Sequence, residues 1–306
     1  MSETRLIVNA DDFGLSRGIS DGILRAHHHG FLTSTSLMVN MPESGHALDR
    51  VSTAARLSVG IHLNICKGKP ILPPRNIPTL VDTGGAFHPP AMMIGKLWRW
   101  QVSARDLERE FRAQIRWMKM RGFNPTHADS HHHMHIYPAA ATAFMRALSA
   151  EGIRCVRAPR CSAWPKAGNL GGPHEGGIIR RLFVHGYRSA LQNTLLRKFH
   201  SADSRVSLSQ QARRDSTNLK SHWMATFENL PGGTFEFACH PGLPERGFSE
   251  TDAIHLQREQ ELRLLLDPEM QGVISRSGIQ LISYRELVAA PQLSEEGPDH
   301  SVCKVA

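Results

Sequence analysis

Two adjacent carboxylates follow a short apolar run near the start of the chain. Residues 5–10 read RLIVNA, and Asp11 and Asp12 come directly after them. Burial of an unpaired charge is costly, so carboxylates at the end of a buried strand usually have a cation nearby. Because successive side chains of a strand point to opposite sides, one carboxylate could bind a metal ion while the other faces a reacting water. A turn held by Asx hydrogen bonds is the alternative for this pair.

Histidines supply further candidate metal ligands. The segment THADSHHHMH holds five of them within nine residues, and His62 lies in the separate apolar run LSVGIHLN. In an extended segment, His127, Asp129 and His131 would share one face. In a helical turn, His131 and His135 would be neighbours, so His131 is the best-placed ligand in both cases. A buried histidine network without a metal is the alternative.

An aspartate with two histidines is typical of a catalytic metal site, because it leaves coordination positions open. The ion in such a site lowers the pKa of a bound water and polarises a carbonyl group, which is the chemistry of hydrolysis. One divalent ion is expected, Zn²⁺ or Mg²⁺. Two imidazoles favour zinc, whereas a mixed set of oxygen and nitrogen donors tolerates several ions.

Alternating strands and helices must position these residues. The expected strands span residues 5–10, 34–40, 57–64, 153–157, 234–240 and 280–283, with a further one near Asp129. The expected helices are one capped by Ser16 and ended by Gly30, followed by residues 103–121, 138–151 and 252–266.

This order predicts an α/β fold with a parallel sheet. The residues that could do chemistry fall at the carboxyl ends of strands, where a (β/α) barrel collects its active site. With about seven strands, a distorted barrel is the first choice, and a doubly wound open sheet is the alternative. One barrel domain is expected over residues 1–290, followed by a flexible polar tail over residues 291–306.

The composition narrows the class of protein. The chain has 306 residues, 41% of them hydrophobic and 21% charged, which fits one large globular domain. No signal-peptide pattern or long apolar run is present, so a cytoplasmic location is expected. The five cysteines contain no Cys-x-x-Cys pair, which argues against a zinc ribbon. Cys239 beside His240 could be a nucleophile, but a strand cysteine is more often a small buried hydrophobe.

The net charge of +8 is concentrated in the middle of the chain. Residues 178–199 combine basic and apolar side chains, so this segment could lie on an anionic lipid surface, with packing against the barrel as the alternative. A nucleic-acid partner is not expected, because interleaved aromatic residues and a reading motif are missing. Whether the chain forms a homodimer stays open.

Four motifs resemble those of the YdjC-like carbohydrate deacetylases, which include chitooligosaccharide and hopanoid-biosynthesis-associated deacetylases. They are VNADDFG at residues 8–14, GIHL at 60–63, THADSHHH at 126–133 and CHPG at 239–242. The resemblance extends from Arg5 to about Leu287. It implies a distorted (β/α) barrel similar to NodB-type deacetylases, and a metal-dependent enzyme that removes the acetyl group from an N-acetylated sugar such as a chitooligosaccharide.

The resemblance also implies roles for individual residues. It makes Asp12, His62 and His131 the metal ligands, Asp11 the general base and His240 the general acid. In the string VRAP, Arg157 is similar to the arginine that lies beside the base in the wider deacetylase group. A further set is expected to bind substrate or to orient the ligands, namely Asp129, His127, His135, Phe13 and Asn64.

The substrate is less well defined than the metal site. Residues 200–222 lack the aromatic–glycine segment expected in the family and are polar and basic instead. The sugar could be free or lipid-linked. A metal-dependent hydrolase of another amide or of a phosphate ester is the nearest alternative, and a barrel that binds sugar without reacting is another.

Overall fold

Eight parallel strands form a single curved sheet in the part of the chain that the structure describes. The structure is a computed structural model and describes residues 3–163, 178–207, 218–245 and 254–289. The strands are β1 (Thr4–Phe13), β2 (Ser34–Leu37), β3 (Ser58–Leu63), β4 (Ala128–Ser130), β5 (Cys161–Ala163), β6 (Ser204–Ser207), β7 (Gly233–Cys239) and β8 (Ile279–Ile282). Their order is β4-β3-β2-β1-β7-β6-β5, and β8 also pairs with β1.

The sheet curls into a partly closed barrel. Cys155 forms a parallel bridge with His200, just before β6, and Val156 forms one with Ala128 of β4. Residues 155 and 156 therefore lie between β4 and the segment that leads to β6. The strand predicted over residues 153–157 is present only as these two isolated bridges. This curvature confirms the prediction of a distorted barrel over a doubly wound open sheet.

Strand β1 is the centre of the sheet. It pairs with β7 from Thr4 to Ala10, and β8 and β2 pair with its first and second halves. The pairing with β2 shifts register between Ala10 and Phe13. Such an irregularity re-aims side chains, and here it falls on Asp11 and Asp12.

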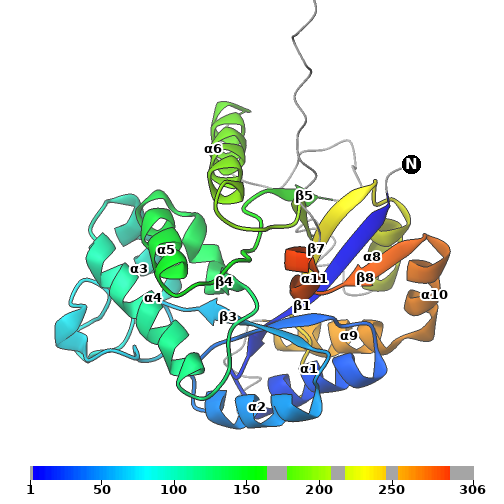
Figure 1. Ribbon diagram of the computed structural model, residues 1–306, viewed down its shortest axis with the longest axis horizontal. Coiled ribbons are helices and arrows are strands. Elements are labelled where there is room, and N and C mark those ends of the chain that lie inside the picture. The colour runs from blue at the N-terminus through cyan, green and yellow to red at the C-terminus, as the bar shows by residue number, and fades with distance from the viewer. Residues whose placement is uncertain (1–2, 164–177, 208–217, 246–253, 290–306) are drawn as a thin grey trace, which may run out of the picture.

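Helices surround the sheet, with α3, α4 and α5 together at one side (Figure 1). Their bounds are α1 (Arg17–His29), α2 (Ser44–Arg50), α3 (Pro90–Trp98), α4 (Ala104–Lys119), α5 (Pro138–Ala150), α6 (Ile178–Leu196), α8 (Leu219–Glu228), α9 (His255–Leu266), α10 (Pro268–Arg276) and α11 (Tyr284–Ala289). Short 3₁₀ turns are η1 (Val51–Thr53), η2 (Pro74–Asn76) and η3 (His131–Ile136). The predicted cap is present, because the Ser16 side chain accepts a hydrogen bond from the Ile19 amide.

The apolar side chains of α4 face the core, as their spacing predicts. Its stripe of Leu107, Phe111, Ile115 and Met118 is buried, and the Phe111 ring meets Phe144 of α5 edge-to-face. Every residue of β3 is also buried, which explains why its sequence is apolar around His62.

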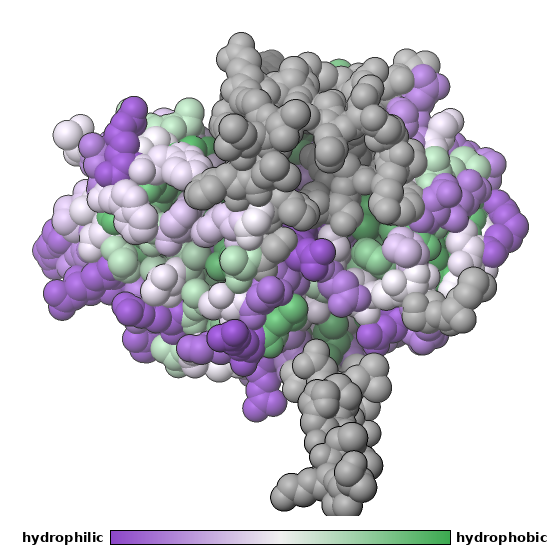
Figure 2. Space-filling view, turned by 90° about the horizontal axis from the view of Figure 1, so that it is seen from above, coloured by the Kyte–Doolittle hydropathy of each residue, from purple (hydrophilic) through white to green (hydrophobic). Residues whose placement is uncertain are grey.

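The outer surface carries mixed side chains. Figure 2 shows hydrophilic side chains around the edge of one face, with hydrophobic ones in separate areas among them. Among the described residues, no helix has both the length and the apolar character needed to cross a membrane. The tail predicted over residues 291–306 lies outside the described residues.

Helix α1 packs closely against the loop that follows β7, and Gly22 makes this approach possible. A Cβ atom at Gly22 would lie 2.7 Å from the Gly242 Cα, whereas one at Gly45 of α2 would meet nothing within 4 Å. Alanine stabilises a helix interior by about 1 kcal/mol relative to glycine. We therefore expect Gly45→Ala to be neutral or stabilising, and Gly22→Ala to lower the free energy of unfolding by about 1–3 kcal/mol through overpacking.

Urea unfolding followed by circular dichroism compares the two variants directly. Equal stabilisation by both substitutions would show that the contact between α1 and the loop is not tight.

Candidate active site

Asp11 and Asp12 lie at the carboxyl end of β1 and are almost completely buried, with exposed fractions of 3% and 2%. Asp12 has a φ of +69°, in the left-handed region that side chains other than glycine rarely adopt. Backbone strain of this kind costs about 1–3 kcal/mol and clusters at functional sites. The strained turn lets the two neighbouring carboxylates reach different partners of one site.

Asp12 lies beside the two predicted imidazole ligands. Its Oδ1 atom is 3.0 Å from His131 Nδ1 and 3.6 Å from His62 Nε2. Each of the three side chains offers one donor atom, and these atoms all lie within 4.8 Å of one another. They come from β1, β3 and the turn after β4, so the curvature of the sheet brings together residues 119 positions apart in the chain.

Neighbouring side chains fix the orientation of this trio. Asp129 Oδ1 lies 2.7 Å from His62 Nδ1, which leaves His62 Nε2 directed toward Asp12. Arg258 donates from Nη2 to Asp12 Oδ2 at 2.7 Å. Asp12 Oδ1 is therefore left buried without a well-aligned hydrogen bond. A carboxylate that orients a metal-ligating imidazole from behind is a common arrangement in metal sites.

The charges of the site suit a divalent cation. Burial by itself would lower the pKa of His62, but the carboxylates of Asp129, Asp11 and Asp12 raise it to about 9. The same negative field that holds a proton on His62 would hold a cation in its place. Together with the buried Asp12 Oδ1, which faces the nitrogens of His62 and His131, this shows that the residues present fit a metal ion with one oxygen and two nitrogen ligands.

Arg157 joins three buried carboxylates beneath this trio. It holds Asp11 with two hydrogen bonds, at 2.6 Å to Oδ1 and 2.7 Å to Oδ2. The same guanidinium lies 2.7 Å from Asp129 Oδ2 and donates from Nε to Glu236 Oε1 at 2.8 Å. Burial would raise the pKa of Asp11, but Arg157 lowers it below its usual value, so Asp11 is ionised at neutral pH.

His240 follows β7 on the other side of Asp11. Its Nε2 atom is 4.0 Å from Asp11 Oδ2, and its side chain is 22% exposed. Its backbone amide donates to Glu261 Oε2 on α9 at 2.5 Å. Burial lowers the pKa of the His240 imidazole, and the nearby carboxylates of Asp11 and Glu261 only partly oppose this. The His240 imidazole is therefore mainly neutral at neutral pH.

The histidines of the segment over residues 127–135 lie in different parts of the barrel. His131 begins η3, and the next two residues adopt left-handed backbone conformations, with φ of 51° and 53°. His135 turns away from the metal trio, contacts Ser130 Oγ at 2.6 Å and stacks on Phe144. His127 lies deeper in the barrel and stacks on Tyr284 with ring centroids 3.7 Å apart.

The other two residues in the predicted supporting set are also buried. Phe13 is part of the hydrophobic core. Asn64 exchanges hydrogen bonds with Gln114 of α4 and so fixes the loop after β3. Of the predicted supporting residues, Asp129 directly contacts His62, a predicted metal ligand.

Three charged residues that contact the site were not predicted. Arg258 and Glu261 reach it from α9, where charged side chains alone would suggest an exposed face. Glu236 alternates with Phe235 and Phe237 in a buried strand, and a charged residue in that position is a signal that sequence reasoning could have used.

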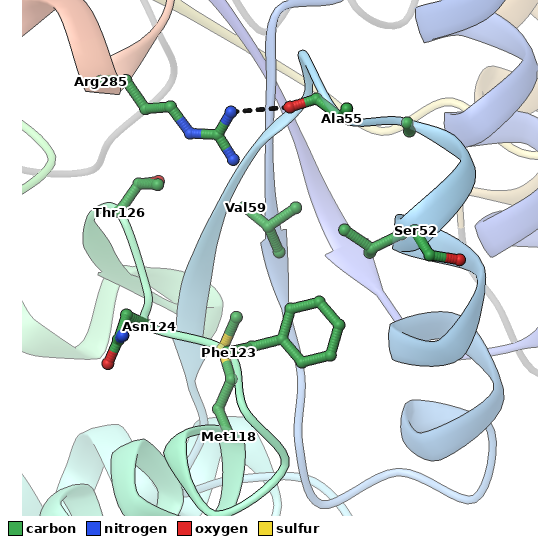
Figure 3. Close-up of a pocket in the computed structure, with 10 residues that line it drawn as sticks. Ser52, Ala55, Val59, Met118, Phe123, Asn124, Thr126 and Arg285 are labelled. Carbon is green, nitrogen blue, oxygen red and sulfur yellow. Dashed lines mark hydrogen bonds between the residues drawn. The ribbon is translucent and has the colours of Figure 1, made fainter.

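A separate cavity of about 290 Å³ lies at the opposite end of the strands (Figure 3). Val59 near the start of β3 and Thr126 before β4 line it, and Arg285 donates to the Ala55 carbonyl at its edge. Apolar side chains such as Met118 and Phe123 make up much of the rest. Residues at the amino ends of barrel strands usually serve stability rather than catalysis.

Relatives with the name carbohydrate deacetylase match nearly the whole chain. The protein from Vibrio vulnificus (strain CMCP6) is 30% identical over 288 residues, which cover 94% of this chain and 98% of that protein. The protein from Geobacillus stearothermophilus is 31% identical over 284 residues, which cover 92% and 96%. A crystal structure described as a "putative cellobiose-phosphate cleavage protein" from Enterococcus faecalis V583 has the same fold, with a TM-score of 0.75 at 24% identity and coverage of 94% and 99%.

A family model described as YdjC-like protein matches residues 5–276. The match begins in β1 and ends with the last residue of α10, so it includes Asp11, Asp12, His62, His131, Arg157 and His240. The resemblance seen in the sequence motifs is thereby confirmed over most of the chain. The chain belongs to the YdjC-like protein family.

Proposed function

We propose that this protein is a divalent-cation-dependent hydrolase that removes the acetyl group from an N-acetylated sugar. The observation that carries the proposal is the convergence of Asp12, His62 and His131 beside an ionised Asp11, with His240 4.0 Å from that carboxylate. Deacetylation needs a cation site, a base and an acid around one reacting carbon, and these residues supply all three.

Asp12, His62 and His131 would hold the cation. When bound, it would polarise the acetyl carbonyl and lower the pKa of a water molecule. Asp129 keeps the His62 ring oriented through Nδ1, and Arg258 holds the second oxygen of Asp12. Zinc and magnesium are both compatible with one carboxylate and two imidazoles.

Asp11 accepts the proton of the attacking water. Its Oδ1 atom accepts hydrogen bonds from Asn9 and from Arg157, whereas Oδ2 accepts one, from Arg157. Oδ2 therefore has the greater capacity for the proton, and it is the oxygen that faces His240. Arg157 keeps the carboxylate ionised before the reaction and fixes its plane.

His240 donates a proton from Nε2 to the departing nitrogen. The water oxygen forms a bond to the acetyl carbon, the carbon–nitrogen bond breaks, and acetate and a free amine leave. The hydrogen bond from the His240 amide to Glu261 fixes the backbone of the loop and so the place from which the imidazole acts.

The names of the relatives support a carbohydrate substrate, and we propose an N-acetylglucosamine-containing glycan. The glycan could be free or lipid-linked. Contact with anionic lipid and formation of a homodimer stay predictions. The family match over residues 5–276 supports our proposal that the barrel is one domain extending to about residue 290.

Acetate release tests the proposed reaction. We expect the purified protein to release acetate from a panel of N-acetylated glycans, to lose activity after chelation and to regain it when zinc or magnesium is restored. Phosphate release from sugar phosphates is measured in parallel. Metal-independent acetate release, or phosphate release without acetate release, would contradict the proposal.

Asp11→Asn separates the base from the metal ligands. The amide cannot accept the water's proton, so we expect turnover to fall by roughly a hundredfold or more. The metal content, measured by mass spectrometry, should be unchanged because Asp11 is not a proposed ligand. Full activity of this variant would show that another group is the base.

Arg258→Met tests how the carboxylate of Asp12 is positioned. Loss of an outer partner of a ligand typically weakens metal affinity by about 10–100-fold. Arg263→Met is the matched control, because Arg263 lies on the same helix and pairs with Glu259 at an exposed position. Metal titrations should show weaker binding for Arg258→Met than for the control, and equal affinities would exclude this positioning role.

A further inference from the structure

A second group of metal-ligating side chains lies beside the proposed catalytic trio. Cys66, His131 and His132 can each offer a donor atom, and these atoms lie within 4.8 Å of one another. The Cys66 side chain is buried, with an exposed fraction of 2%, whereas His132 is exposed to solvent. The reaction proposed above uses neither Cys66 nor His132.

The loop after β3 holds Cys66 in place. The Cys66 amide donates to Asn64 Oδ1 at 3.0 Å, and Asn64 exchanges two backbone hydrogen bonds with the Gln114 side chain of α4. Asn64 Nδ2 also donates to the carbonyl of Lys67 at 2.7 Å. The thiol is thus positioned by a hydrogen-bonded loop that is anchored to a helix.

A strained backbone brings the two imidazoles together. Successive side chains of an extended segment point to opposite sides, but His132 has a φ of +51°. This left-handed turn places the rings of His131 and His132 with centroids 4.3 Å apart. A backbone conformation of this kind is unfavourable for histidine and persists where the surrounding structure imposes it.

We propose that Cys66, His131 and His132 form a second cation site that prefers zinc to magnesium. Thiolate sulfur and imidazole nitrogen are donors that zinc favours, whereas magnesium favours oxygen. On binding, the Cys66 S–H bond breaks, its proton passes to solvent and a sulfur–zinc bond forms. Three protein donors leave one position of a tetrahedral ion for water, and exposed His132 gives solvent access to the site.

The two sites share the ring of His131. If the proposed function is correct, zinc in the second site draws on an imidazole that the catalytic trio also needs. The further inference rests on the proposed function for this consequence only. Zinc bound at the second site then lowers the rate of deacetylation, and this loss depends on Cys66.

Cobalt substitution tests the second site without reference to activity. Cobalt(II) bound by a thiolate gives a sulfur-to-metal charge-transfer absorption that imidazole and carboxylate ligands do not give. We expect the full-length protein to show this absorption as cobalt is added. Cys66→Ser should still bind cobalt through Asp12, His62 and His131 but lack the absorption.

Three further variants locate the donors. Asp12→Ala should keep the absorption, because Asp12 belongs to the first trio alone. Cys303→Ser should also keep it and serves as the control for another thiol. His132→Asn should weaken cobalt binding at the second site by about tenfold or more, and asparagine tolerates the left-handed backbone of that position.

Absence of the charge-transfer absorption in the unaltered protein, or its persistence in Cys66→Ser, would overturn the second site. A separate assay follows acetate release at rising zinc concentration. At saturating zinc, the unaltered protein should release acetate more slowly than Cys66→Ser, and equal rates would overturn the proposed competition for His131. If no deacetylation occurs, the cobalt titration still decides whether the second site exists.

Discussion

The charge buried at the carboxyl end of β1 must be compensated, and the surrounding strands and helices are arranged to do so. Asp11, Asp12, Asp129 and Glu236 are buried together, and the guanidinium groups paired with them are those of Arg157 and Arg258. The carboxylates outnumber the guanidiniums. Buried carboxylates are tolerated only when they are paired or bind a cation. A divalent ion between Asp12, His62 and His131 would offset the excess negative charge, and without an ion a proton on His62 offsets part of it.

Several elements of the barrel position the partners of the buried carboxylates. β1 pairs with three strands and ends in an irregular, left-handed turn that separates the partners of Asp11 from those of Asp12. Helix α9 contacts both halves of the site, because Arg258 holds Asp12 while Glu261 holds the backbone of His240. The same elements that close the fold therefore set the distance between the proposed metal ligand, base and acid.

Local patterns were sufficient to predict much of this arrangement. Long apolar runs identified β1, β3 and β7, and a serine cap with helical periodicity identified α1 and α4. The short strands β5 and β6 were missed because their sequences, CSA and SRVS, contain too few apolar residues to give an apolar run. Sequence could not show the path of the histidine cluster after His131, since the left-handed residues His132 and His133 follow neither strand nor helix periodicity. The role of Arg258 was equally hidden, because its contact with Asp12 spans 246 residues.

Crystallography of the protein loaded with one equivalent of zinc, with anomalous data collected at the zinc edge, would locate the bound ion. We expect one strong anomalous peak with ligand distances of about 2.0–2.2 Å to Asp12, His62 and His131. A dominant peak bound by other residues, with these three side chains unoccupied, would contradict it.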